Sequence, residues 1–225
     1  MPINIVFYGD CICTGQYVSV DQTWVVHIAQ KLREKYPNVV VMNPSTNGFT
    51  TRQAIDRMSY ELSKIKIDIM IIQYGMNDCN YWETDKGIPR VSPEVFEASL
   101  VEMANRASLF GAKIVFFMVS QPSGRDVSEL KYAGGRTYQQ CLDSYNNIIR
   151  RVSQKHFGFG IGLIDMDKYF KKVTGGNRAK LLPLLMPEPD LIHLSPKGHD
   201  IYVEYVFPIL DDMVERLEYQ KRISP

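Results

Sequence analysis

Residues 3–15 read INIVFYGDCICTG, and the rest of the chain can be interpreted outward from this stretch. A short, mainly apolar run over 3–8 is followed at once by Gly9-Asp10. An apolar run closed by a turn-forming pair is typical of a buried strand. We therefore expect the chain to begin with a strand whose carboxyl end carries polar residues.

Apolar runs of the same kind recur along the chain, and segments with helical periodicity separate them. The expected strands after the first lie over 39–42, 67–74, 113–119 and 160–164. The expected helices lie over 23–36, 51–62, 92–110, 137–156 and 195–219, with Pro208 expected to kink the last one. This alternation predicts one α/β layer sandwich over residues 1–225, built on a parallel five-stranded sheet.

Composition excludes several other classes of protein. The chain has 225 residues with 26 Lys plus Arg and 25 Asp plus Glu, so a net charge of +1 offers no basic field for nucleic acid. No window approaches 18 uninterrupted apolar residues, and the N-terminus lacks the features of a signal peptide, so we expect no membrane span. Four cysteines make no disulfide framework, which favours reduced thiols and a cytoplasmic location. No ligand cluster or dinucleotide fingerprint predicts a metal or an organic cofactor.

Four short motifs lie where expected strands end or where the last helix begins. They read GDCICTG at 9–15, NGFTT at 47–51, GMND at 75–78 and DLIHLSPKGH at 190–199. Each motif alone is a weak signal. Open α/β sheets place their sites at the carboxyl edge of the strands, and long connections such as 75–91, 120–136 and 172–194 commonly carry function. The joint order of the motifs therefore predicts one site at that edge.

Taken together, the four motifs resemble those of the SGNH (GDSL-like) hydrolase superfamily. The resemblance runs from Gly9 to His199, and the third and fourth motifs match without a mismatch. It implies a flavodoxin-like three-layer α/β/α sandwich. It also implies acyl-ester hydrolase chemistry, with Cys11 at the nucleophile position, where the family has serine.

The resemblance assigns the other site residues as well. His193 is implied as the general base and Asp190 as the residue that orients it. The implied oxyanion hole consists of the backbone N–H groups of Cys11 and Gly48 and the side-chain amide of Asn77.

The residue types fit this chemistry without the family name. Acyl transfer needs a nucleophile, a base and donors for the oxyanion that develops. Histidine is the side chain best suited to act as a general base near neutral pH, and His193 is placed for this role. Cys11 at the start of a helix, near an imidazolium, leads us to expect a stabilised thiolate.

Cysteine in place of serine leaves alternatives open. The chain is either a natural thiol variant or a serine enzyme whose nucleophile has been replaced. A thiolate leaves more easily than an alkoxide, so Cys11 favours thioesters or acyl transfer over plain ester hydrolysis. A thioesterase or acyltransferase is therefore one alternative, and a non-catalytic module that binds a glycan or acyl ligand is another.

Three aromatic residues are the candidates for substrate contact. Tyr17 follows the first motif, and Tyr81 and Trp82 follow the third. Aromatic rings at the mouth of a cleft can stack on a sugar or cover an acyl chain, although they can equally pack their own loops. With the resemblance, they favour a small-molecule or carbohydrate acyl ester, such as an acetylated sugar, as substrate.

Overall fold

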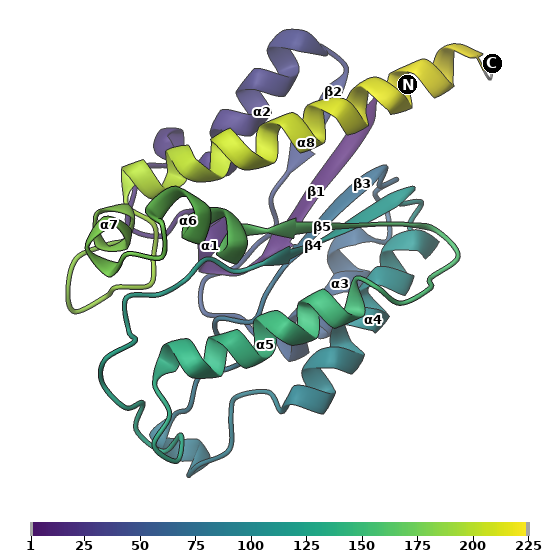
Figure 1. The fold of residues 1–225 in the computed structure, drawn as a ribbon. Helices are drawn as coiled ribbons and strands as arrows, with labels where there is room; N and C mark the ends of the chain where they lie inside the picture. Colours follow the sequence, from purple (N-terminus) through teal and green to yellow (C-terminus); the bar gives the residue numbers. More distant parts are fainter. Residues whose placement is uncertain (1, 224–225) are drawn as a thin grey trace.

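A computed structural model describes residues 2–223, and it arranges them in three layers (Figure 1). The central layer is a parallel sheet of five strands in the spatial order β2-β1-β3-β4-β5. The strands are β1 (Ile3–Gly9), β2 (Val39–Met42), β3 (Ile69–Gln73), β4 (Ile114–Val119) and β5 (Gly160–Asp165). The predicted α/β sandwich with a parallel five-stranded sheet is confirmed.

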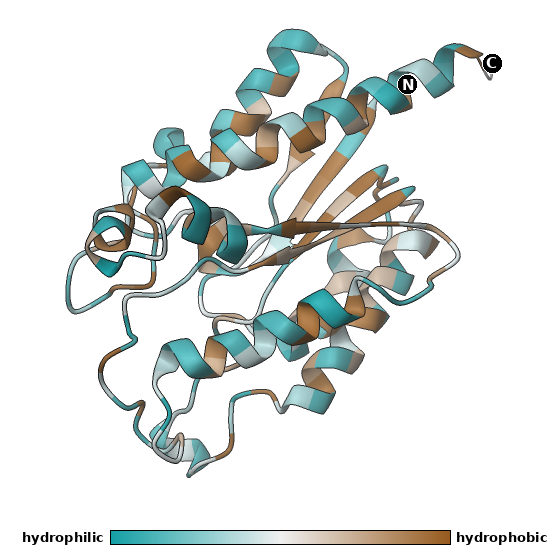
Figure 2. Ribbon diagram, in the orientation of Figure 1, coloured by the Kyte–Doolittle hydropathy of each residue, from teal (hydrophilic) through white to brown (hydrophobic). Residues whose placement is uncertain are grey.

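Helices cover both faces of the sheet. On one face lie α3 (Thr51–Leu62), α4 (Pro93–Leu109) and α5 (Tyr138–Val152), and on the other lie α2 (Trp24–Lys35), α6 (Met166–Thr174) and α8 (Pro196–Ile223). The shorter elements are α1 (Cys11–Thr14), α7 (Arg178–Leu181) and the 3₁₀ helices η1 (Val20–Gln22), η2 (Glu83–Asp85) and η3 (Leu182–Leu184). Figure 2 shows apolar strands between helices whose outward faces are hydrophilic, so the core lies on both sides of the sheet.

The strand order reverses at β1, and this reversal positions the site. From β1 the chain crosses to β2 on one side and then returns to β3 on the other, where Gly9 lies opposite Gln73. Crossovers that leave in opposite directions open a crevice at the carboxyl ends of the two strands. The first motif begins at the end of β1 and the third follows β3, so the two motifs border this crevice.

The structure differs from the expected elements mainly in its last third. The connection expected after residue 172 begins inside α6, which starts where Asp165 accepts the N–H of Lys168 at 3.0 Å and ends at Gly175 with φ 64°. The helix expected to end near 219 reaches Ile223 and continues through Pro208 without interruption. Between residues 2 and 223, no helix combines the length and apolar character needed to cross a bilayer.

Candidate active site

The first motif forms a short helix at the end of β1. Asp10 begins α1 by accepting the N–H of Ile12 at 3.0 Å, and Gly15 ends it with φ 73°. Trp24 donates its indole N–H to the carbonyl of Ile12 at 2.8 Å, which fixes α1 against α2. Cys11, the first residue of α1, is therefore held at the carboxyl edge of the sheet and is only 5% exposed.

The predicted oxyanion-hole donors converge on the sulfur of Cys11. The Nδ2 of Asn77 lies 4.0 Å from Sγ. The backbone N–H groups of Gly48 and of Cys11 itself also lie near the thiol, where they lower its pKa. Gly48 has φ 74°, a backbone conformation that favours glycine in this turn. Three segments that follow three different strands thus meet around one atom.

The thiol is less acidic than the sequence led us to expect. Burial raises the pKa of Cys11 well above its usual value, and the neighbouring Asp10 raises it further. The three donors around Sγ act in the opposite direction but do not outweigh burial. The helix that Cys11 begins has only four residues, so its dipole is small. The expectation of a stabilised thiolate is therefore wrong, and Cys11 rests as a thiol that needs a base.

Two buried carboxyl groups support the nucleophile side. Burial raises the pKa of Asp10 to about 7 and that of Asp78 to about 6. Asp10 also accepts from Nδ2 of Asn77 at 3.4 Å. Asp78 accepts the backbone N–H of Thr51 at 2.9 Å and its hydroxyl at 2.5 Å, which ties the third motif to the second. Both carboxyls thus anchor neighbouring segments of the site.

Asp190 and His193 form a pair in the loop before α8. The Nδ1 of His193 lies 2.7 Å from Oδ2 of Asp190, and Oδ1 of Asp190 accepts the backbone N–H groups of Ile192 and His193 at 2.9 and 2.7 Å. These contacts lower the pKa of Asp190, so it stays ionised and fixes the imidazole tautomer. The Nε2 of His193 is buried without a hydrogen-bond partner among the described residues, so no hydrogen bond joins it to Cys11.

Tyr17 links the first motif to this pair. Its ring meets the ring of His193 edge-on, with centroids 5.0 Å apart and an interplanar angle of 85°. Tyr17 and Leu191, which lies between Asp190 and His193, are both held at positive φ, 75° and 56°. Non-glycine residues in this conformation are strained and cluster at functional sites. Tyr17 contacts the imidazole, and Leu191 lies in the loop that carries it.

Residues 190–193, which we call the base loop, are held by a segment after β4, residues 121–125. This segment binds the backbone carbonyls of the base loop. Arg125 donates from Nε to the carbonyl of Asp190 at 2.7 Å, and the N–H of Gly124 donates to that of Leu191 at 2.8 Å. Gln121 donates from Nε2 to the carbonyl of Ile192 at 3.0 Å. Three consecutive carbonyls of the base loop are thus bound from one segment. We call residues 121–125 the carbonyl clamp.

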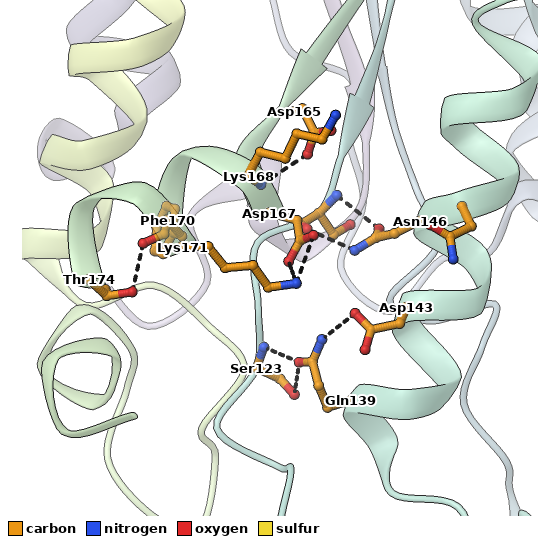
Figure 3. Close-up of polar contacts among 12 residues, drawn as sticks. Ser123, Gln139, Asp143, Asn146, Asp165, Asp167, Lys168, Phe170, Lys171 and Thr174 are labelled. Atoms are coloured by element: carbon orange, nitrogen blue, oxygen red, sulfur yellow. Dashed lines mark hydrogen bonds and ion pairs between the residues drawn. The ribbon is translucent and has the colours of Figure 1, made fainter. Parts of the chain in front are cut away.

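The carbonyl clamp is itself held by α5 (Figure 3). Gln139 accepts the backbone N–H of Ser123 at 2.6 Å, and Asp143 in turn accepts from Gln139 at 2.9 Å. One turn further along α5, Asn146 exchanges hydrogen bonds with the backbone of Ser120 at 3.2 and 3.0 Å. Polar side chains of α5 therefore hold the segment that binds the Asp190–His193 loop.

Sequence reasoning missed Gln121, Arg125 and Arg90. Gln121 comes just after β4, as the recognised motifs come just after their strands, so its position was a usable signal. Arg90 lies at the end of a long loop and bridges Asn77 and Gly48, and nothing in its local sequence indicates this.

The three aromatic residues predicted to contact the substrate differ from one another in exposure. Trp82 is 50% exposed and Tyr17 63% exposed. Tyr81 is partly buried against the core and forms an isolated bridge with Pro89. A cavity of about 460 Å³ lies beside the base loop, with Leu191, Arg125 and Tyr138 among its lining residues.

His199 has a structural role near the site. Its Nδ1 accepts the N–H of Trp24 at 3.2 Å, which joins the first turn of α8 to the start of α2. Burial lowers the pKa of His199 to about 4, so the ring is neutral. Between residues 2 and 223, no group of three His, Cys, Asp or Glu side chains is arranged to hold a metal ion.

Comparison with known proteins identifies relatives of this chain. A model of the GDSL-like lipase/acylhydrolase family matches residues 7–201. An arylesterase from Vibrio mimicus is 25% identical over 131 residues, which are 57% of this chain and 62% of that protein. The chain thus spans less than two thirds of that curated relative.

Solved structures share the fold. An acetyl xylan esterase, AlAXEase, superposes with a TM-score of 0.72 at 15% identity, covering 92% of this chain and 99% of that one. A lipase/acylhydrolase from Enterococcus faecalis gives a TM-score of 0.71 at 19% identity, covering 94% and 96%. The predicted flavodoxin-like sandwich is therefore confirmed.

Proposed function

Because the chain belongs to the GDSL-like lipase/acylhydrolase family, we propose that it is an acyl-ester hydrolase with Cys11 as nucleophile. His193 is its general base and Asp190 orients that base. The backbone N–H groups of Cys11 and Gly48 and the Asn77 amide form the oxyanion hole.

The observation that carries the proposal is the convergence of donors on Sγ. A substrate carbonyl carbon attacked by this sulfur brings its oxygen close to the same donors. Preorganised donors of this kind stabilise the negative charge that develops on the oxygen, and losing one costs about 10²–10³ in rate. Loops that only needed packing would not require three N–H groups around one buried thiol.

The reaction proceeds in two halves. His193 takes the Cys11 proton as Sγ bonds to the carbonyl carbon, and the carbonyl oxygen becomes the oxyanion. The oxyanion collapses, the bond to the alcohol breaks, and His193 returns its proton to the leaving oxygen. Water, deprotonated by His193, then attacks the acyl thioester and releases the acid and the Cys11 thiol. Because the thiol pKa is raised, proton removal must accompany attack rather than precede it.

We propose a small acyl group, such as acetyl on a carbohydrate, as the natural substrate. The exposed aromatic rings of Trp82 and Tyr17 suit a sugar, with Tyr81 as a more buried candidate contact. The acetyl xylan esterase that shares the fold acts on substrates of this class, which supports the proposal by analogy alone.

A second candidate, a thioesterase or acyltransferase, is favoured by Cys11 itself. With an oxygen ester, the tetrahedral intermediate expels thiolate more readily than alkoxide, so attack tends to reverse. With a thioester, both groups that the intermediate can expel are thiolates. Expulsion of the substrate thiolate then competes well with the reversal of attack.

The test compares the chain with Cys11→Ser on p-nitrophenyl acetate, acetylated xylo-oligosaccharides and an acyl thioester. Ester hydrolase function predicts that both forms release acetate and that the serine form is faster on oxygen esters. Faster thioester turnover by the cysteine form alone supports the second candidate. Absence of turnover in both forms contradicts both and favours a binding module.

A further inference from the structure

Arg90 joins two of the oxyanion-hole donors through one guanidinium group. Its NH1 donates to Oδ1 of Asn77 at 3.3 Å, and its NH2 donates to the carbonyl of Gly48 at 3.0 Å. These residues come from the third and second motifs, which follow different strands. A planar guanidinium presents its donors in a fixed fork, so the two contacts set the spacing between the motifs.

The contact with Asn77 decides which way its amide faces. A side-chain amide can rotate by half a turn, and only one orientation aims Nδ2 at Sγ. Arg90 offers only donors, so it selects the orientation with Oδ1 toward itself. At the other end, Nδ2 donates to Asp10 at 3.4 Å and lies 4.0 Å from Sγ. The amide is therefore fixed between a cation and a carboxyl group.

The contact with Gly48 adds a second restraint to the turn over residues 46–49, which the N–H of Phe49 closes by donating to the carbonyl of Thr46 at 3.3 Å. Gly48 lies at φ 74° with no atom within 4 Å of the position a Cβ would take. Glycine can adopt φ values of either sign, and its N–H points toward Sγ in only some of these conformations. By binding the carbonyl of Gly48, Arg90 restrains this turn.

Arg90 is itself held in place. Its guanidinium lies over the ring of Trp82, 3.9 Å from the centroid, and its backbone N–H donates to the carbonyl of Asn80 at 2.9 Å. The bridge between Tyr81 and Pro89 closes the same loop. The face of Trp82 that Arg90 covers is thus used for positioning.

We propose that Arg90 is the positioning residue of the oxyanion hole, which orients the Asn77 amide and the Gly48 turn toward the reacting carbonyl oxygen. This inference rests on the proposed function for its kinetic consequence. Its structural consequence, the orientation of donors around Cys11, does not depend on turnover. The two can therefore be tested separately.

The kinetic test compares Arg90→Met and Arg90→Lys with the unchanged chain. On its best ester or thioester, Arg90→Met should lose about 10- to 100-fold in kcat with little change in KM, because displaced donors stabilise the transition state less. Arg90→Lys keeps the charge but not the fork, so it should recover only part of the loss. Added guanidinium ion should partly restore Arg90→Met. Arg106→Met, which removes an arginine from the outer surface of α4, is the matched control and should keep full activity.

Full activity in Arg90→Lys or in Arg90→Met would overturn the proposal. Thermal unfolding shows whether a variant is misfolded or only has displaced donors, and guanidinium rescue requires a folded chain.

A second readout is the rate at which iodoacetamide alkylates Cys11 at pH 8.5, followed by mass spectrometry. Displaced donors should slow alkylation in Arg90→Met and leave Arg106→Met unchanged. If no form turns over any ester but this rate still falls, the proposed function fails and the role of Arg90 stands. An unchanged rate together with unchanged kcat removes Arg90 from the site.

Discussion

Cys11 and His193 belong to two parts of the site that are built differently. Cys11 follows β1 almost directly, and its partners Gly48 and Asn77 lie just beyond β2 and β3, so the sheet fixes them through short lengths of chain. His193 lies well beyond the last strand, in a loop whose backbone carbonyls are bound by the carbonyl clamp. The nucleophile part is therefore set by chain continuity with the sheet, and the base part by hydrogen bonds between distant segments.

This difference indicates where the site is most easily disturbed. Strand ends in a five-stranded sheet cannot move without breaking the core. A loop held by a few hydrogen bonds can shift by an ångström when one is lost, and shifts of that size can cost about 10²-fold in rate. Changes in the base part should therefore alter activity while the sheet and its core stay folded.

The largest effect is expected when either part loses its reacting group. Cys11→Ala and His193→Ala should each lower kcat/KM by at least about 10³, because no other group replaces the nucleophile or the base. Hydrolysis of the preferred ester or thioester measures this loss. Cys141→Ala, a buried cysteine on α5, is the control for removing a thiol. Substantial activity in His193→Ala would mean that another residue is the base.

The pH dependence of stability tests a contact that joins the two parts. His199 has a pKa of about 4, below its usual value of about 6.5, so it stays neutral when folded. The unfolded chain binds this proton between pH 6.5 and 4. The contribution of His199 to the free energy of unfolding is thus present above pH 6.5 and falls by about 3 kcal/mol toward pH 4.

Chemical denaturation of the unchanged chain and of His199→Asn at pH 7.5, 6, 5 and 4 measures this contribution. Asparagine at position 199 does not titrate. The free energy of unfolding of the unchanged chain should therefore fall, relative to that of His199→Asn, as pH falls. We compare the two chains because both also contain Asp10 and Asp78, whose pKa values are raised. These carboxyls stabilise the fold more as pH falls, which is opposite to His199, and their effect cancels in the difference. Parallel stability curves would show that His199 is not held neutral.

Gln121→Leu should weaken the base part selectively. The buried amide donates to the carbonyl of Ile192 and accepts the Tyr202 hydroxyl at 2.5 Å, so the change leaves two buried polar groups without partners. We expect a loss of about 1–3 kcal/mol in stability and a fall of about tenfold in kcat. Gln30→Leu, on the exposed side of α2, is the matched control for denaturation and kinetics. Unchanged kcat in Gln121→Leu would show that the base loop does not depend on the clamp.

The smallest effect is expected at Tyr17. Tyr17→Ala removes the ring that meets His193 edge-on, an interaction worth about 0.5–1.5 kcal/mol, so kcat/KM should fall several-fold. Tyr17→Phe keeps the ring and should behave like the unchanged chain. If the phenylalanine variant is as impaired as the alanine variant, the hydroxyl rather than the ring contact matters.

Much of the nucleophile part was readable from the sequence. Apolar periodicity located the strand ends after which Gly48 and Asn77 stand, and the resemblance of the motifs predicted their role as oxyanion donors. The acidity of Cys11 was not readable: the expected thiolate depended on helix length and exposure, and the structure gives a four-residue helix and a buried thiol.

The sequence by itself determined the alternation of strands and helices, the parallel sheet, and the short-range pair of Asp190 and His193. These follow from periodicity and from spacings of a few residues, which local chain geometry converts into structure. Only the tertiary structure decided that Arg90 bridges two motifs and that residues 121–125 bind the base loop. Such contacts join side chains far apart in the sequence, and their partners are set by how the layers pack.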